Sequence, residues 1–319
     1  MGFLWEVLIA SALWLFLKTT ILLYIFSHQF INLSELIYHW TRDFRLGEIT
    51  FAGGNFWRVF LQSQNFVLFI AVALCAGLFF VKKTTKIKEL FLYLLILLCL
   101  FSTLIMSYSR SFWLALFVSL FVIIIFSGVN LGFKTMMTRL FILSGTVILS
   151  LLLVYFTVNF PYPRISTSGG LITKRLQNIS GEAGGSSRLN QLQPLWEGII
   201  RSPLLGSGFG TPITYISNDP RVVASSVDQS GIYTTYSFEW GYLDVWLKIG
   251  LLGLGVYLWF IYMLILKAYK NKQLLSQALV FGFIAIAITH VTTPYLNHPL
   301  GIGLLFILLA SCELNYETI

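Results

Sequence analysis

Charged residues are scarce in this chain, and their scarcity argues against an ordinary soluble domain. Only 11% of the 319 residues are charged, whereas 57% are hydrophobic. This composition is typical of a protein embedded in a membrane. The formal net charge of +8 would favour nucleic acid as the partner of a soluble protein. Here both sides of the membrane share the charge, so we expect no nucleic-acid partner.

Cysteines and paired carboxylates are scarce as well. The three cysteines, Cys75, Cys99 and Cys312, lie in apolar runs and lack CxxC spacing. They are predicted to be small buried side chains rather than disulfides or zinc ligands. The sequence has no D-x-D motif, and its four aspartates are scattered. We therefore predict no bound metal and no other cofactor.

Long apolar runs are abundant, and they predict eight transmembrane helices. The runs are Phe3–Phe26, Phe66–Val81, Leu90–Ser107, Phe112–Ser127, Leu140–Val158, Tyr242–Leu266, Leu275–Thr293 and Leu300–Leu314. A span takes about 20 apolar residues, so the second, fourth and eighth runs are short for crossing a membrane. The first run is itself long enough to span, so no cleavable signal peptide is expected.

The predicted fold class is an all-α polytopic membrane protein with one large, partly helical extracytoplasmic loop. Residues 1–158 carry helices 1–5, residues 159–240 form the loop, and residues 241–319 carry helices 6–8. We expect the three parts to build one integrated membrane domain. Asp244 and Lys248 are four residues apart in helix 6, so they are predicted to pair with each other.

Two of the predicted outer segments are long enough to carry function. Within Ser27–Asn65, the stretch Phe56–Phe60 mixes aromatic rings with an arginine and is predicted to lie at headgroup depth. Asn159–Trp240 is polar and rich in glycine and serine, but Ser187–Ile200 repeats apolar residues at three- and four-residue spacing. This spacing predicts an amphipathic helix, and Pro203 and Gly206 are predicted to end it.

Lysines and arginines are sorted into different connecting segments. The positive-inside rule puts the lysine-rich segments and both termini in the cytoplasm; these lysines are Lys82, Lys83, Lys86, Lys88, Lys134, Lys267, Lys270 and Lys272. The outer segments then hold nearly all the arginines: Arg42, Arg45, Arg58, Arg110, Arg164, Arg175, Arg188, Arg201 and Arg221. An arginine offers phosphate oxygens a planar, permanently charged fork. We therefore predict an outward-facing site for an anionic, lipid-linked substrate.

Several short motifs in the second half of the chain carry a family resemblance. They are Ser187-Arg188, Trp196 and the turn Pro203-Leu204-Leu205-Gly206-Ser207-Gly208-Phe209-Gly210. Together they resemble the large extracytoplasmic loop of O-antigen ligases and related polysaccharide polymerases. Ser107-Tyr108-Ser109-Arg110-Ser111 resembles the S-R motif of that superfamily.

The same resemblance places Glu239 at a special position. In the superfamily a His-Asn pair opens the helix after the large loop, and a Gly-x-x-Gly follows nine residues later. Gly250 and Gly253 match the glycines, so Glu239-Trp240 stands where the His-Asn pair would be. The chain thus has a carboxylate in place of the histidine of the ligases. Members of the superfamily are also typically longer at the N-terminus.

The resemblance implies a metal-free, inverting glycan transfer from an undecaprenyl diphosphate donor. Arginines would stabilise the diphosphate that leaves, and a general base would take the proton of the acceptor hydroxyl. We assign the first role to Arg110 and Arg188 and the second to Glu239. Further substrate-binding candidates are Arg58, Arg175, Arg201, Arg221, His290 and His298.

Each assignment has a plainer alternative. Arg110 is alternatively a helix-end charge that reaches the headgroups, and Arg188 is alternatively a solvated surface residue or a partner of Glu182. Glu239 is alternatively an interfacial carboxylate paired with an arginine. The other arginines are alternatively contacts of lipid headgroups. His290 and His298, which flank the turn between helices 7 and 8, either replace the missing family histidine or have structural roles.

The predicted function is that of a polymerase at the outer face of the bacterial cytoplasmic membrane. It would transfer a glycan from its lipid diphosphate to a lipid-linked repeat unit, for O-antigen, capsule or exopolysaccharide. Expected partners are the lipid-linked donor and acceptor, membrane lipid, a flippase and a chain-length regulator. A ligase to lipid A-core or to protein is the alternative within the same chemistry. A flippase or other transporter of lipid-linked oligosaccharides is the alternative outside it.

Overall fold

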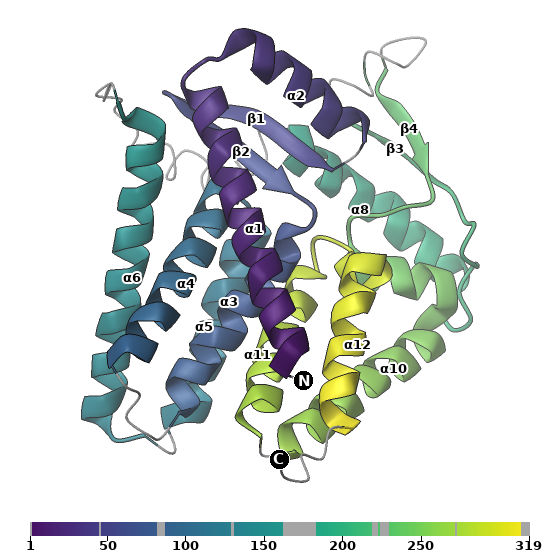
Figure 1. Ribbon diagram of the computed structural model, residues 1–319. Helices are drawn as coiled ribbons and strands as arrows, with labels where there is room; N and C mark the ends of the chain where they lie inside the picture. Colours follow the sequence, from purple (N-terminus) through teal and green to yellow (C-terminus); the bar gives the residue numbers. More distant parts are fainter. Residues whose placement is uncertain are drawn as a thin grey trace. The chain divides into compact units, whose positions relative to one another are not determined.

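The computed structural model describes residues 2–44, 46–81, 87–128, 131–161, 183–218, 223, 230–271 and 273–313, and most of them are helical (Figure 1). The helices are α1 (Gly2–Ser27), α2 (Ile31–Asp43), α3 (Gln64–Phe80), α4 (Ile87–Ser107), α5 (Arg110–Gly128), α6 (Phe133–Asn159), α8 (Ala183–Arg201), α10 (Gly241–Lys270), α11 (Leu274–Thr289), the 3-10 turn η1 (Tyr295–Asn297) and α12 (Pro299–Glu313). The strands are β1 (Gly47–Gly53), β2 (Phe56–Leu61), β3 (Ile213–Ile216) and β4 (Ile232–Thr235).

Contacts divide the chain into two compact units. Unit 1 comprises Met1–Ser168, Lys267–Ile286 and Gly303–Ile319, and unit 2 comprises Gly169–Leu266 and Ala287–Ile302. Unit 1 therefore holds α1 to α6 with the β1–β2 hairpin. Unit 2 holds α8, the β3–β4 hairpin and most of α10.

Five described helices are long and apolar enough to cross a membrane, namely α1, α4, α5, α6 and α10. The other three predicted runs form shorter apolar helices, α3, α11 and α12. The prediction of a mainly helical, polytopic membrane protein is confirmed, while the number of eight spans stays a prediction. Helix α5 is longer than predicted, and α11 stops at Thr289 instead of Thr293. Pro294 cannot extend the helix, because it has no N–H to donate and its ring clashes with the carbonyl of the residue four positions earlier.

Two small antiparallel sheets were missed by the all-α prediction. In unit 1, β1 pairs with β2 from Gly47 opposite Leu61 to Gly53 opposite Phe56. Gly54 connects the strands with a φ of 62°, a conformation that glycine adopts without strain. The sequence Gly53-Gly54-Asn55 between two β-prone runs is the local signal that predicts such a hairpin. In unit 2, β3 pairs with β4 over four residues each.

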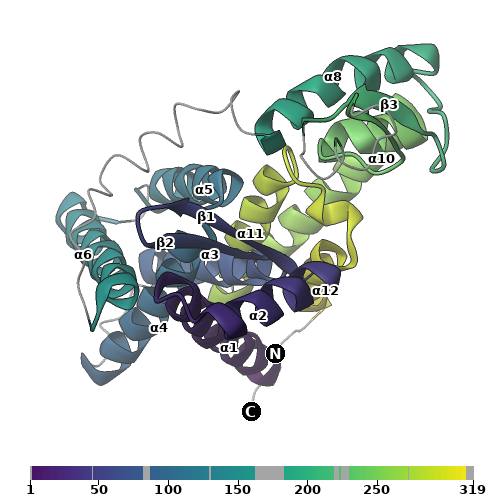
Figure 2. The same cartoon turned by 90° about the horizontal axis from the view of Figure 1, so that it is seen from above.

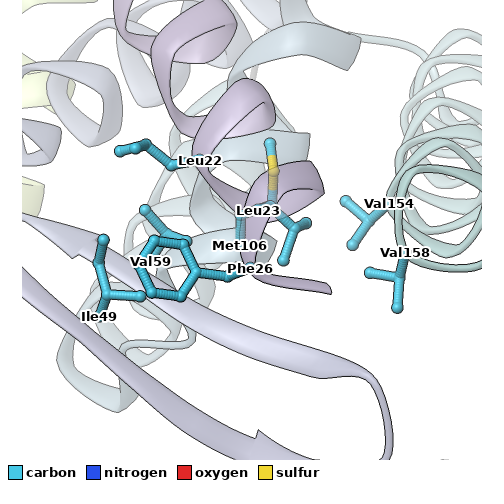
Figure 3. Close-up of a cluster of buried hydrophobic side chains, with 8 residues drawn as sticks. All are labelled: Leu22, Leu23, Phe26, Ile49, Val59, Met106, Val154 and Val158. Atoms are coloured by element: carbon cyan, nitrogen blue, oxygen red, sulfur yellow. The ribbon is translucent and has the colours of Figure 1, made fainter. Parts of the chain in front are cut away.

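The β1–β2 hairpin is attached to the helices of unit 1 by a common apolar core (Figure 3). This core joins side chains from α1, both strands, α4 and α6: Leu22, Leu23, Phe26, Ile49, Val59, Met106, Val154 and Val158. Gln64, which is fully buried, donates to Val59 O at 3.2 Å and accepts from Leu61 N at 3.1 Å. Apolar packing and satisfied backbone groups together hold the hairpin on the helix ends.

Helix α2 lies crosswise to α1 and runs beside the hairpin (Figures 1 and 2). Only His28, Gln29 and Phe30 separate it from α1. On its inner side, Ile37 and Tyr38 pack against the hairpin core. The segment Ser27–Asn65 is thus a folded helix–hairpin layer at one end of α1, and the stretch predicted to lie at headgroup depth, Phe56–Phe60, forms most of β2.

Candidate functional site

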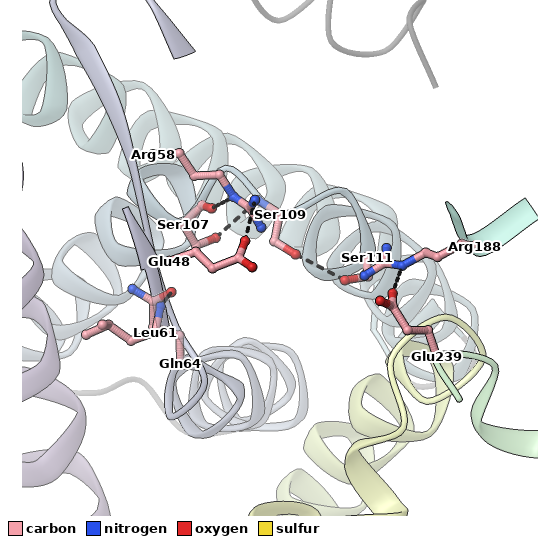
Figure 4. Close-up of polar contacts among 9 residues, drawn as sticks. All are labelled: Glu48, Arg58, Leu61, Gln64, Ser107, Ser109, Ser111, Arg188 and Glu239. Carbon is pink, nitrogen blue, oxygen red and sulfur yellow. Dashed lines mark hydrogen bonds and ion pairs between the residues drawn. The ribbon is translucent and has the colours of Figure 1, made fainter. Parts of the chain in front are cut away.

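Arg188 and Glu239 form an ion pair in unit 2 (Figure 4). Arg188 lies in the first part of α8 and donates its Nε–H to Glu239 Oε2. Both side chains stay accessible, with exposed fractions of 38% and 48%. An ion pair so exposed adds only about 0–1 kcal/mol to folding stability. The pair therefore contributes little to the stability of the fold, but it places a guanidinium beside a carboxylate.

Two further contacts hold the Glu239 backbone against α8. Gln191, which is buried, accepts a hydrogen bond from Glu239 N at 3.0 Å. The Trp240 indole donates to Arg188 O at 2.9 Å. Arg188 and Gln191 are three residues apart, so they share one face of α8. That face therefore sets where the Glu239 carboxylate lies.

The same face of α8 continues into an apolar core. Leu195 and Ile199 pack there with Ile213, Phe238 and Leu247. Each of these buried side chains contributes about 1.5–3 kcal/mol by leaving water. The amphipathic helix predicted for Ser187–Ile200 is thus confirmed as part of α8, which ends at Arg201 just before Pro203.

Helix α10 is broken at Gly250, where φ is 71° and ψ is 178°. A break leaves backbone groups on both sides without helical partners, and the turn after α8 supplies them. Ser207 N donates to Leu247 O and Gly208 N to Lys248 O, at 2.8 and 3.0 Å. In the other direction, Leu251 N donates to Pro203 O at 2.8 Å and Leu252 N to Leu204 O at 3.2 Å.

Glycines make this close approach possible. Gly206 also has positive φ, 76°, and its backbone lies against that of Lys248 and Gly250. A Cβ on Gly250 would overlap the carbonyl of Leu204. The two glycine motifs of the sequence are therefore the two sides of one packing contact. A Cβ on Gly253 would also come too close to the side chain of Ile249, whose Cβ would lie 2.7 Å away.

The first two turns of α10 carry the predicted Asp244–Lys248 pair. Lys248 Nζ lies 2.6 Å from Asp244 Oδ1, which confirms that prediction. Asn297, in η1, donates to Asp244 Oδ2 at 2.7 Å. These contacts tie the start of α10, two residues after Glu239, to the turn that precedes α12.

His290 is fully buried beside that turn. Its Nδ1 accepts from Leu296 N at 3.2 Å, and its ring meets the Tyr242 ring edge-on at 4.7 Å between centroids. Burial lowers the pKa of His290 to about 4, so the ring is neutral at pH 7. His298 is exposed and accepts from Leu300 N, near the start of α12.

In unit 1, Arg110 is the first residue of α5 and is half-buried. The turn before it is tight: Tyr108 adopts a left-handed φ of 49°, and its ring packs edge-on against Phe56 and Trp113. Ser109 and Ser111 share a hydrogen bond at 3.0 Å (Figure 4). A non-glycine residue in this conformation is strained, so the surrounding packing must hold the turn.

Arg58, on β2, reaches the same turn. It donates from Nε to Ser107 O at 3.1 Å and lies 3.6 Å from Glu48 Oε2 (Figure 4). Its side chain is only 18% exposed and lies over the Phe60 ring at 4.9 Å. The structure therefore connects Arg58 with the S-R turn, three residues before Arg110, which sequence spacing did not indicate.

The remaining sequence-predicted residues are not brought together by the described contacts. Arg201 ends α8 and is exposed. Arg175 and Arg221 lie outside the described residues, as do Arg45, Arg164 and Glu182. Arg188 has Glu239 as its partner in the described part of the chain.

Sequence inspection missed the residues that support this site. Gln191, Asn297 and Glu48 carry no motif, and only the fold brings each to its partner. Trp240 had been noted only for its place beside Glu239. The three-residue spacing of Arg188 and Gln191 was a sequence signal that both side chains lie on one face of a helix.

A family model described as O-antigen ligase matches residues 94–258 of the chain. The match covers slightly more than half of the 319 residues and contains the S-R turn, α8 and the break in α10. A search of curated proteins found no match. Members of the matched family are glycosyltransferase-like ligases and polymerases of multi-pass membrane character, with lipid-linked glycans as substrates. Our chain belongs to the O-antigen ligase family.

Proposed function

We propose that this protein is a glycan polymerase that uses an undecaprenyl diphosphate donor at the outer face of the cytoplasmic membrane. The Arg188–Glu239 pair is the observation that carries the proposal. It places a cation that can bind a diphosphate beside a carboxylate that can accept a proton. Both lie in the part of the chain that the O-antigen ligase family model matches, and Glu239 stands where the ligases carry a histidine.

The reaction exchanges one bond for another at the anomeric carbon of the donor glycan. The acceptor hydroxyl oxygen attacks this carbon from the face opposite the diphosphate, which inverts the configuration. The bond to the diphosphate oxygen breaks, and its electron pair stays on that oxygen. The hydroxyl proton passes to the carboxylate of Glu239. The products are the extended glycan and the free lipid diphosphate.

Arg188 can serve both partners of this exchange. Its Nε–H goes to Glu239, and the guanidinium carries four further N–H donors on its terminal nitrogens. Those donors suit the oxygens of a diphosphate. The positive charge beside Glu239 also favours the ionised carboxylate, the form that accepts a proton.

Arg110 is proposed as a second diphosphate ligand. A cation at a helix N-terminus is opposed by the helix dipole. An anion bound there would be attracted by both the arginine and the helix end. Arg58, which is hydrogen-bonded to the same turn, adds a second positive side chain to that end of unit 1.

We assign His290 and Asn297 a supporting role. Neutral His290 already uses Nδ1 as an acceptor and is fully buried. Asn297 holds Asp244, and through it the start of α10. This arrangement favours Glu239, which is half-exposed, as the group that meets the acceptor.

The orientation is also a proposal and rests on the sorting of lysine and arginine. A cysteine at the exposed Phe209 should react with a membrane-impermeant maleimide added from outside. A cysteine at Lys88 should react only after the membrane is permeabilised. The opposite pattern would place the proposed site on the wrong face.

Reconstitution distinguishes polymerase from ligase. The full-length protein in liposomes is given one undecaprenyl-diphosphate-linked repeat unit, and the products are separated by length. A polymerase produces a ladder of lipid-linked glycans from this single substrate. A ligase leaves the substrate unchanged until lipid A-core is added, and that result would replace our proposal. Retained synthesis with EDTA is expected, because arginines take the place of a divalent cation.

A further inference from the structure

Helix α2 presents an uncovered apolar stripe. Leu33, Leu36, Trp40 and the residue that follows the helix, Phe44, are spaced so that they share one side of it. Their exposed fractions reach 68% at Leu36 and 69% at Phe44. The opposite side carries Glu35, His39 and Arg42, which are exposed as well. The third side faces the hairpin, so the apolar stripe stays largely exposed among the described residues.

The stripe continues an exposed apolar surface of a candidate membrane span. Helix α1 is a candidate span, and it exposes a row of large apolar side chains: Phe3, Val7, Trp14, Leu17, Ile21 and Tyr24. At the end of that row, the Tyr24 ring lies 6.1 Å from the Phe30 ring. Phe30 in turn immediately precedes α2. The lipid-facing surface of α1 therefore runs without interruption onto the apolar stripe.

A cation marks the depth of this junction. Lys18 lies within the α1 span, nine residues before its end, and its Nζ lies 5.2 Å from the centre of the Trp40 ring. A charged side chain inside a span reaches toward the interface. Trp40 therefore lies near the level at which that ammonium leaves the apolar core. Tryptophan is enriched at this level of a bilayer.

We propose that α2 lies in the lipid–water interface, with Leu33, Leu36, Trp40 and Phe44 immersed in phospholipid and Glu35, His39 and Arg42 in water. The partner is the phospholipid surface itself, with its phosphates available to Lys18. An apolar groove of about 490 Å³ between α1 and α6, lined in part by Ile21, Tyr24 and Phe156, can take an acyl chain at the same end.

The consequence concerns the hairpin. Ile37 and Tyr38 of α2 pack on the core that contains Ile49 and Val59. Arg58 is next to Val59 and is bound to the S-R turn. An interfacial α2 therefore holds Arg58 at the depth of lipid phosphates. This last step rests on the proposed function, whereas the position of α2 does not.

Nitroxide scanning tests the position of α2 independently of activity. Single cysteines replace Leu33, Leu36, Phe44, Glu35, His39 or Arg42 in the full chain, with the three native cysteines replaced by alanine. Each spin-labelled protein is placed in phosphatidylethanolamine–phosphatidylglycerol vesicles, and collisions with oxygen and with a water-soluble nickel chelate are measured. We expect oxygen to dominate at the first three positions and nickel at the last three.

Two results would overturn the inference. Equal access of nickel to all six positions would mean that α2 stands in water. Exclusion of both reagents from the apolar positions would mean that protein covers the stripe. Bromolipid quenching provides a second measurement with the native cysteines in place. The fluorescence lost in Trp40→Phe should be quenchable by acyl-brominated lipid, and quenching of that contribution by aqueous iodide instead would contradict the proposal.

Discussion

Replacement of Gly250 by alanine should destabilise unit 2 and disable the proposed site. At φ 71° and ψ 178°, Gly250 occupies a region that is accessible almost only to glycine. Forcing alanine into it costs about 1–3 kcal/mol. The added Cβ would also overlap the Leu204 carbonyl. If the Leu204 carbonyl moves away, the hydrogen bond from Leu252 N to Leu204 O breaks. The neighbouring bond from Leu251 N to Pro203 O breaks with it.

These terms set the expected size of the effect. Each lost hydrogen bond costs about 0.5–1.5 kcal/mol. Together with the backbone strain, Gly250→Ala should lower the free energy of unfolding by about 2–6 kcal/mol. Gly255→Ala is the matched control, because Gly255 lies in the same helix and a Cβ there meets nothing within 4 Å. Alanine should stabilise that position by about 0.5–1 kcal/mol.

The assay is heating of the purified proteins in one detergent, followed by tryptophan fluorescence, with polymerisation measured in parallel. Gly250→Ala should melt several degrees lower than the wild type, whereas Gly255→Ala should melt at the wild-type temperature or above. The break lies close to the turn after α8, so glycan synthesis should fall together with stability. Identical melting and synthesis in Gly250→Ala and Gly255→Ala would refute the hydrogen-bonded break.

Three further predictions concern the charged and titratable residues. Glu239→Gln keeps the shape of the side chain but loses its basicity, so transfer should fall about 10²–10⁴-fold; Glu239→His should retain more activity, and equal activity of Gln and Glu would remove the base role. Arg188→Lys and Arg110→Lys should each reduce the stabilisation of the transition state by about 2.7–4 kcal/mol, because a point charge cannot reproduce the guanidinium fork. Normal glycan ladders at matched protein levels would contradict this. His290 has a folded-state pKa of about 4, below its ordinary 6.5, so the unfolded state binds more protons between these values. Stability should therefore be complete above pH 6.5 and be lost as pH falls toward 4. His290→Asn, which keeps an acceptor for Leu296 N, should flatten the dependence of melting temperature on pH, and an unchanged slope would show that another group is responsible.

Local sequence predicted the elements that depend on composition and period. Apolar runs gave the positions of the membrane helices, because their length and hydrophobicity suffice to favour burial in lipid. The apolar spacing at Ser187–Ile200 gave α8. Asp244 and Lys248 were found from their four-residue separation alone. The β1–β2 hairpin was missed although Gly53-Gly54-Asn55 is typical of a hairpin turn. The surrounding aromatic residues are also typical of a membrane–water interface, and they were interpreted in that way.

The candidate site depended on contacts between distant segments. Arg188 and Glu239 are 51 residues apart, and spacing along the chain could match each to a motif without joining them. The same holds for Gly206 and Gly250, whose backbones meet at the break in α10. Arg58 reached the S-R turn only because β2 packs on the end of α4.

The class of this protein, the positions of its helices and its family motifs could be predicted from hydrophobicity, period and local spacing, because each of these is a property of short stretches of chain. The partners of Arg188 and Arg58, in contrast, follow from the packing of distant segments. Glu182 was the near neighbour of Arg188 in sequence, yet Glu239 is the carboxylate that α8 and the start of α10 bring to it. The physical reason is that the buried core of Leu195, Phe238 and Leu247 fixes where those two elements meet, and side-chain ion pairs at the surface are too weak to choose that arrangement.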